Sequence, residues 1–178
     1  MGASTPDVGA DVRGRGRDWL AASALLIFAA LRLFILEPTS ISSDSMRPTL
    51  DRGDVVLVDK LSPRLGYRPD HGDLVTFTSP ADSKPTLKRV VGVAGDRVRI
   101  DDGVLIVNNR KVPEPYVDQR TIDALYWGTI TVPAGQAIVL GDQRAGSIDS
   151  RTYGPIPLTA IQGRALLRVW PLTRVRDR

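Results

Sequence analysis

Residues 19–36, WLAASALLIFAALRLFIL, form a long apolar run in which only Ser23 and Arg32 are polar. At about 1.5 Å per residue, a helix of this length extends roughly 27 Å, close to the thickness of about 30 Å of a bilayer core. Pro38 prevents the helix from continuing, because proline cannot occupy a helix interior without breaking it. The run therefore predicts one transmembrane helix over residues 19–36.

The flanking residues predict how this helix is oriented. Arg13, Arg15 and Arg17 precede it, and positive charge favours the cytoplasmic side of a membrane. Residues 1–18 are small, polar and basic, which predicts a disordered cytoplasmic tail. Residues 37–178 are then expected on the extracytoplasmic side.

Two other interpretations of the apolar run stay open. It resembles the apolar region of a cleavable signal peptide, with Ser40-Ile41-Ser42 as a poor cleavage site. It could also be a buried helix of a soluble domain, although residues 19–31 show no polar face.

Beyond residue 50 the pattern changes to short β-branched runs separated by turn residues, which predicts a mostly β domain over residues 37–178. A small extension is expected around residues 97–135. Segment 110–128 contains two prolines and no clear period, and is expected to be a surface loop. The runs that predict strands are 54–60, 73–79, 86–95, 97–100, 104–109, 129–135, 137–142 and 164–170.

Composition excludes several kinds of chemistry. The chain has no cysteine, which rules out disulfides, a cysteine nucleophile and thiolate metal sites. Its single histidine, His71, precedes a glycine and is expected in a turn, so neither a Ser-His-Asp triad nor a histidine-rich metal site is favoured. The net charge is +4, and nine of the 24 lysines and arginines lie in 1–17 and 164–178 or close to the helix, so no central basic run favours nucleic acid binding.

Three serines gather in ISSDSMRPTL, residues 41–50, just after the apolar run. A serine hydroxyl is a weak nucleophile until a base removes its proton. Lysine can be that base only where burial lowers its pKa from an ordinary value near 10.4.

Lys88 is the lysine whose surroundings best fit that requirement, because it lies inside the apolar run TLKRVVGV. Lys60, Lys84 and Lys111 stand at a strand end or in loops. A solvated lysine on a strand is the commoner case, so spacing alone leaves both interpretations of Lys88 open.

Three segments together resemble the motifs of type I signal peptidases. Residues 41–50 resemble the serine box, residues 87–96 (LKRVVGVAGD) the lysine box, and residues 141–154, which begin GDQRAGSIDSR, the C-terminal box. The motifs occur in the family order behind one N-terminal anchor, and the resemblance extends over roughly residues 19–170.

The resemblance implies a Ser-Lys dyad, a variant of the serine protease triad. In this arrangement Ser45 is the nucleophile and Lys88 is the general base. The Ser43 hydroxyl contributes to the oxyanion hole beside the Ser45 N–H, and Ser147 orients the lysine ammonium.

Two structural ion pairs are also implied, Asp142 with Arg89 and Asp149 with Arg151. The family requires no metal and no organic cofactor, so none is expected here. Gln143 and Ala94 depart from the residues usual at their positions, asparagine and proline, and both adjoin implied functional residues.

The implied substrates are exported preproteins, whose signal peptides carry small residues at two alternating positions before the cut. An extended peptide presents alternate side chains to the enzyme, and Ile41, Met46 and Leu87 are expected to line the pockets that receive them. The resemblance thus implies a membrane-anchored serine endopeptidase, bound to the lipid bilayer, that removes signal peptides.

Aromatic and long apolar side chains near a membrane can contact lipid headgroups or pack in the core. Met46, Tyr126 and Trp127 are expected to contact the headgroups. Core packing is the favoured interpretation of Trp170.

Other functions also fit parts of the sequence. A specialised Ser-Lys peptidase with narrow substrates, such as pilin or conjugation proteins, would carry the same dyad. A LexA-like self-cleaving regulator is disfavoured, because no helix-turn-helix precedes the β domain. A membrane-tethered β binding module without catalysis is the alternative from a different class.

Overall fold

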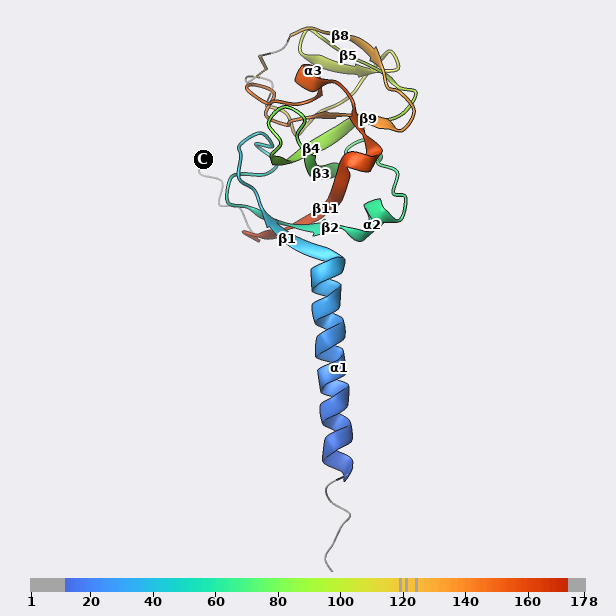
Figure 1. The fold of residues 1–178 in the computed structure, drawn as a ribbon. Coiled ribbons are helices and arrows are strands. Elements are labelled where there is room, and N and C mark those ends of the chain that lie inside the picture. Colours follow the sequence, from blue (N-terminus) through green and yellow to red (C-terminus); the bar gives the residue numbers. More distant parts are fainter. Residues whose placement is uncertain (1–11, 119, 121, 124, 173–178) are drawn as a thin grey trace, which may run out of the picture.

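A computed structural model describes residues 12–118, 120, 122–123 and 125–172 of the chain. One helix, α1 (Val12–Phe34), projects from a body made of β-strands and short helices (Figure 1). The body confirms the expectation of a mostly β domain.

Helix α1 differs from its sequence prediction at both ends. The helix begins at Val12, so residues 12–18 of the expected tail belong to it. Residues 1–11 of the expected tail lie outside the described residues. At the other end the helix stops at Phe34, and Leu36 already belongs to a strand.

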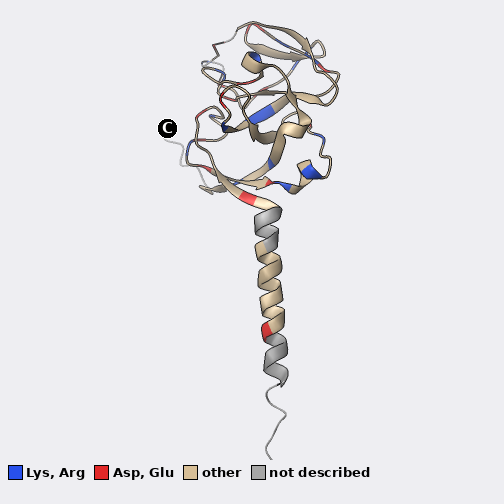
Figure 2. Cartoon of the chain, viewed as in Figure 1, with Lys and Arg blue, Asp and Glu red and all other residues tan. Residues whose placement is uncertain are grey.

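The described side chains of α1, residues 18–29, are exposed and carry one charge, that of Asp18 (Figure 2). Within the described part of the chain, no helix has the length and hydropathy that a membrane crossing requires. Six large apolar side chains of the helix are at least 60% exposed: Trp19, Leu20, Leu25, Leu26, Ile27 and Phe28.

The larger of two sheets has seven strands in the order β1-β2-β11-β3-β4-β9-β10, and every neighbouring pair is antiparallel. Its last strand in sequence lies between two earlier ones near the middle of the sheet. The strands are β1 (Leu36–Ser40), β2 (Val55–Asp59), β3 (Leu74–Thr78), β4 (Pro85–Gly92), β9 (Gln136–Leu140), β10 (Ile156–Pro157) and β11 (Ile161–Trp170). Pro38 lies in β1, at the edge of the sheet, where a residue without an N–H is tolerated.

The smaller sheet has the order β7-β6-β5-β8. Its strands are β5 (Arg97–Asp101), β6 (Val104–Val107), β7 (Arg110–Lys111) and β8 (Trp127–Thr131). Asp102 and Gly103 join β5 to β6 with φ values of 50° and 73°, the left-handed conformation of the tight hairpin turn that suits strand twist. The described part of the body also contains the short helices α2 (Leu61–Arg64), α3 (Ser150–Tyr153) and η2 (Leu158–Ala160).

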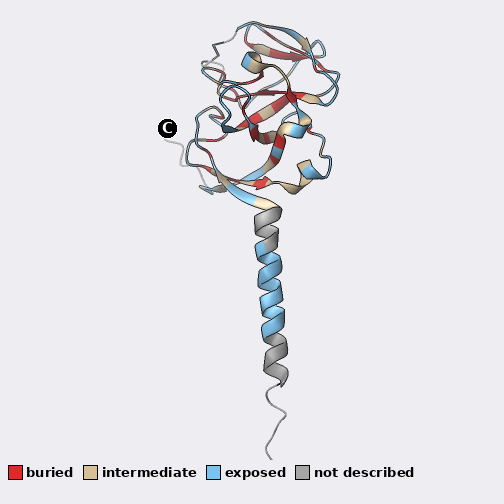
Figure 3. Ribbon diagram, viewed as in Figure 1, coloured by how far each residue is buried: buried red, intermediate tan, exposed pale blue. Residues whose placement is uncertain are grey.

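Buried residues gather inside the β body, while residues 18–29 of α1 are exposed (Figure 3). One cluster joins the two sheets, because it contains Val91 and Ile138 from the larger sheet and Val98 and Leu105 from the smaller one. A second cluster is built on β3, β4 and β9. A third lies under the serine segment and comprises Ile41, Met46, Leu50, Val56, Val58 and Leu87.

Two expectations about apolar residues are wrong. Met46 is only 1% exposed and packs in the third cluster, so it is not available to lipid. Trp170 is 63% exposed, because it is the last residue of β11 and does not face the core. Tyr126 is exposed and Trp127 is partly buried against the first cluster.

The expected surface loop 110–128 contains more buried structure than its sequence suggested. Val117 is buried, and the Glu114 side chain is only 3% exposed. The segment also includes β7 and the start of β8. Glu114 turns inward because it pairs with a buried arginine, as described below.

Candidate active site

The serine segment forms an irregular loop between β1 and β2. The Ile41 N–H donates to Asp54 O at 2.8 Å, and the Leu50 N–H donates to Met46 O at 2.9 Å, which closes the loop on itself. Because its apolar side chains turn into the third cluster, its serines are left at the surface. Ser43 Oγ and Ser45 Oγ lie 3.1 Å apart, within hydrogen-bond distance.

The main chain of Ser45 is held by the segment that follows β9. The Gln143 N–H donates to Ser45 O at 3.1 Å. Gly141 lies so close that a Cβ there would fall 2.7 Å from Ser45 O and 2.2 Å from Ser147 Oγ. Glycine is therefore required at this position, and Ser147 lies beside the Ser45 backbone.

Lys88 lies in the interior of β4, directly opposite Val75 of β3, and only 3% of it is exposed. Burial lowers the pKa of Lys88 to about 8, with the Asp149 and Asp142 carboxylates raising it and Arg151 lowering it further. Among the described residues, no side chain forms a hydrogen bond or ion pair with its ammonium group. Lys88 is thus a desolvated amine whose pKa lies near the physiological range.

Arg89, the next residue of β4, forms the expected contact with Asp142. Its Nε lies 2.8 Å from Asp142 Oδ1 and its Nη2 lies 2.7 Å from Oδ2, a bidentate pair. Its Nη1 donates to Gly72 O at 2.9 Å, and its guanidinium lies 3.9 Å from the centre of the Tyr116 ring. Thr49 of the serine loop also donates to Asp142, so this carboxylate joins the loop to β4.

Asp149 and Arg151 also lie in contact. The Arg151 Nε is 2.9 Å from Asp149 Oδ1, and Asp149 is completely buried. Asp149 Oδ2 accepts from the Gly141 N–H at 3.0 Å, while Arg151 Nη2 donates to Arg144 O at 2.7 Å. The pair therefore holds the turn that brings Gly141 against Ser45.

The Ser147 hydroxyl is buried and has no hydrogen-bond partner among the described residues. Leaving a buried hydroxyl unpaired costs about 1–3 kcal/mol. Such a group is free to accept a hydrogen bond from a nearby ammonium without first breaking another one.

The residues on either side of Lys88 in β4 both connect this strand to the loop that carries Ser45. Leu87 packs with Met46 in the third cluster. Arg89 reaches the serine loop through the carboxylate that they share. The structure therefore brings the serine, lysine and C-terminal segments together.

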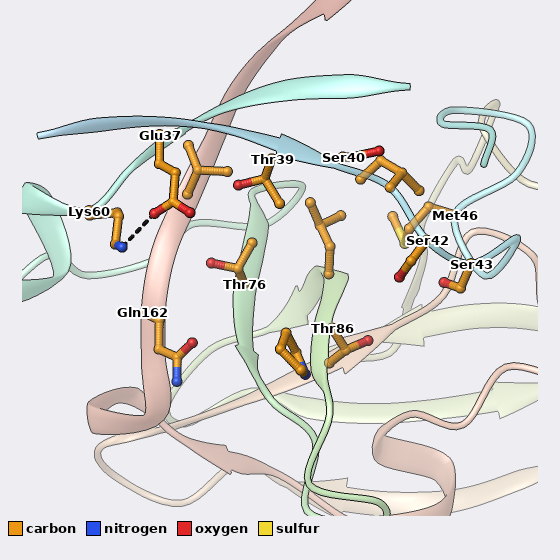
Figure 4. A pocket seen from close by; sticks show the side chains of 14 residues that line it. Glu37, Thr39, Ser40, Ser42, Ser43, Met46, Lys60, Thr76, Thr86 and Gln162 are labelled. Atoms are coloured by element: carbon orange, nitrogen blue, oxygen red, sulfur yellow. Dashed lines mark hydrogen bonds and ion pairs between the residues drawn. The ribbon is translucent and has the colours of Figure 1, made fainter. Parts of the chain in front are cut away.

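A groove of about 280 Å³ opens beside the serines (Figure 4). Ile41, Met46 and Leu87, which the sequence nominated as substrate contacts, all line it, and so does Ser43. Ser45 adjoins the groove through its contact with Ser43. The remaining lining residues are Glu37, Thr39, Ser40, Ser42, Val58, Lys60, Thr76, Pro85, Thr86 and Gln162.

Sequence reasoning missed a buried ion pair behind the site. Arg144, 1% exposed, donates to Glu114 at 2.5 Å through Nη2 and to Gly141 O at 3.1 Å through Nε. Tyr116 donates to the same Glu114 carboxylate at 3.0 Å. A buried arginine needs an acidic partner, but the chain has 20 aspartates and glutamates, so the sequence alone did not single out Glu114.

The single histidine lies in the turn before β3, with Nε2 2.7 Å from Asp96 Oδ2. Within the described ranges, no group of three or more histidine, aspartate or glutamate side chains is arranged to hold a metal ion.

Comparisons with known proteins identify the family of this chain. The family model for signal peptidase, peptidase S26, matches residues 17–170. A signal peptidase I of Bacillus caldolyticus is 36% identical over 169 residues, which cover 88% of this chain and 92% of that protein. A probable signal peptidase I-2 of Synechocystis is 36% identical over 160 residues, which cover 86% of this chain and 72% of the relative.

A solved structure shows the same likeness. The crystal structure of a signal peptidase I from Enterococcus faecalis V583 superposes with a TM-score of 0.50 at 28% identity, covering 57% of this chain and 98% of that one. The chain therefore belongs to the signal peptidase family, peptidase S26, and is an enzyme of the signal peptidase I type.

Proposed function

We propose that this signal peptidase is a membrane-anchored serine endopeptidase that removes signal peptides from exported preproteins with a Ser45–Lys88 dyad. The observation that carries the dyad is the burial of Lys88 in β4, which lowers its pKa to about 8 next to the serine loop. A lysine of this kind is unprotonated often enough near neutral pH to act as a base.

In the proposed mechanism, Ser45 Oγ attacks the carbonyl carbon of the scissile bond and its proton passes to Lys88 Nζ. The negative charge that develops on the carbonyl oxygen is stabilised by the Ser45 N–H and the Ser43 hydroxyl, whose Oγ lies 3.1 Å from Ser45 Oγ. Lys88 then donates its proton to the leaving amine. Water, deprotonated by neutral Lys88, hydrolyses the acyl-enzyme and regenerates Ser45.

Ser147 is assigned the role of a positioning residue for Lys88. Its buried hydroxyl, without a partner among the described residues, can accept a hydrogen bond from the Lys88 ammonium once the proton has transferred. The ion pairs of Asp142 and Asp149 keep the C-terminal segment against Ser45.

The apolar run 19–36 is proposed to anchor the enzyme, with the β body on the extracytoplasmic side. The exposed apolar side chains of α1, and the arginines that precede the run in the sequence, support this topology. Ser45 follows the run by only a few residues, so the cut is made close to the membrane surface, where the signal peptide is held.

Ser45→Ala is expected to abolish cleavage of a short peptide that carries Ala-x-Ala before the scissile bond, because alanine has no hydroxyl to attack the carbonyl carbon. The full chain and the variant are purified in detergent, and products are identified by mass spectrometry. Thr131→Ala, which removes an exposed hydroxyl from the smaller sheet, serves as the matched control and should cleave normally. Undiminished cleavage by the Ser45 variant contradicts the proposed nucleophile.

Cleavage is also expected to depend on pH through Lys88. Below its pKa the lysine is an ammonium and cannot accept the serine proton, so kcat/KM should rise as the pH increases through about 8 and level off above it. Initial rates with one peptide between about pH 6 and pH 10 measure this profile, and circular dichroism checks that the fold persists. A midpoint near the ordinary lysine value of 10.5 contradicts a functional role for the lowered pKa.

A further inference from the structure

The groove beside the serines follows the direction of β1. Alternate residues of a strand face the same side, and Glu37, Thr39 and Ile41 all line the groove at this two-residue spacing. The groove therefore extends along β1 from the beginning of that strand to the serine loop. Other strands of the larger sheet contribute further lining residues, including Lys60 after β2 and Gln162 in β11.

The two ends of the groove differ in chemistry (Figure 4). Figure 4 shows Met46 beside Ser43 at one end, and the apolar Ile41 and Leu87 belong to the same cluster as Met46. At the far end, Figure 4 shows Glu37 and Lys60 joined in an ion pair, with Gln162 on the same side.

The ion pair at this far end is accessible. Lys60 Nζ lies 2.5 Å from Glu37 Oε2, and the side chains are 34% and 51% exposed. The Gln162 amide donates to Thr78 Oγ1 at 2.9 Å through Nε2, which leaves its carbonyl oxygen as an acceptor. The polar end therefore offers groups of both charges and an amide oxygen.

The polar end lies next to the end of α1. Helix α1 stops at Phe34, β1 starts at Leu36, and the Lys60 N–H donates to Ile35 O at 2.8 Å. A substrate that approaches from the side of α1 therefore meets Glu37 first and the serines last. Because β1 is the edge strand of its sheet, its outer edge can pair with such an extended peptide.

We propose that Glu37, Lys60 and Gln162 form a subsite for a polar side chain about five residues before the scissile bond. This inference rests on the proposed function. A peptide laid along β1 has the same two-residue period, so its first, third and fifth residues before the cut face Ile41, Thr39 and Glu37 in turn.

The subsite is expected to favour polar side chains. An apolar side chain placed over the ion pair would exclude water from both charged groups without replacing the hydrogen bonds that they make to water. Neutral polar side chains fit the subsite without disturbing the balance between the two charges. Removing one partner leaves the other unbalanced, and that remaining charge then attracts an opposite charge on the substrate.

The test uses four Ala-x-Ala peptides that differ only in the fifth residue before the cut: serine, lysine, glutamate or leucine. The unmodified enzyme should cleave the leucine peptide with a kcat/KM about fivefold lower than that of the serine peptide. This factor corresponds to the interaction free energy that is typical of a partly exposed ion pair. Lys60→Met should favour the lysine peptide over the glutamate peptide by about fivefold relative to the unmodified enzyme, and Glu37→Gln should reverse this preference.

Lys111→Met, which removes an exposed lysine of β7, is the matched control and should keep the original preferences. Cleavage of the serine peptide by each variant shows that it folds. If both groove variants retain the original order of preference, the subsite is overturned while the proposed function stands. If the unmodified enzyme cleaves none of the peptides, or the Ser45 variant cleaves them, the proposed function fails and the subsite fails with it.

Discussion

Lys88→Met is expected to lower kcat/KM for an Ala-x-Ala peptide by about 10³-fold or more without unfolding the enzyme. Methionine has a similar length and no proton-accepting group, and removal of a positioned base typically reduces rates by about 10²–10⁴-fold. Since Lys88 is only 3% exposed, the substitution also removes a charge from an apolar environment, and the midpoint of thermal unfolding should not fall.

The dyad also predicts how the Lys88 and Ser45 variants combine. Residues that act as one catalytic unit show strongly non-additive effects, so Ser45→Ala combined with Lys88→Met should be no slower than Ser45→Ala alone. Lys111→Met provides the control for loss of a lysine at the surface. Cleavage by Lys88→Met within about tenfold of the original rate, less than the loss of a base typically causes, excludes Lys88 as the base.

Arg144→Met should produce the largest loss of stability among the substitutions described here. The change leaves the Glu114 carboxylate, 3% exposed, without its ionic partner in the interior. Breaking one side of a buried ion pair typically costs about 3–5 kcal/mol, which for a chain of this size lowers the unfolding midpoint by roughly 10 °C. Cleavage should fall as well, because Arg144 Nε also holds the Gly141 carbonyl beside Ser45.

A double variant distinguishes the stability lost through an unpaired buried charge from the stability lost through altered packing. Combining Arg144→Met with Glu114→Leu removes both charges and should recover much of the lost stability, because apolar replacements of buried pairs are often neutral. Arg120→Met is the matched control, since its ion pair with Asp118 is exposed and its loss should hardly move the midpoint. Unfolding of Arg144→Met at the original temperature contradicts a structural role for the buried pair.

The strands and motifs of this fold could be predicted because their signals are local. The run around Lys88 is rich in β-branched residues, and β4 forms there. The resemblance to signal peptidases implied the partners of Arg89 and Arg151, and both contacts are present.

Other features could not be predicted, because they depend on contacts between distant segments. Glu114 is separated from Arg144 by thirty residues, and nothing in its proline-rich surroundings indicates that it turns inward. The burial of Met46 depends on an irregular loop, where no period relates sequence to side-chain direction. Trp170 is exposed because it is the last residue of β11, and the apolar composition of the strand does not reveal this.

The position of β11 has a consequence for the order of events during synthesis. This strand follows every other strand in the sequence, yet it pairs with β2 on one side and β3 on the other. A nascent chain can therefore expose Ser45 and Lys88 long before the sheet that supports them is continuous. Because such non-local pairing is slow, the sheet is expected to become continuous only after β11 has been synthesised and has inserted between β2 and β3.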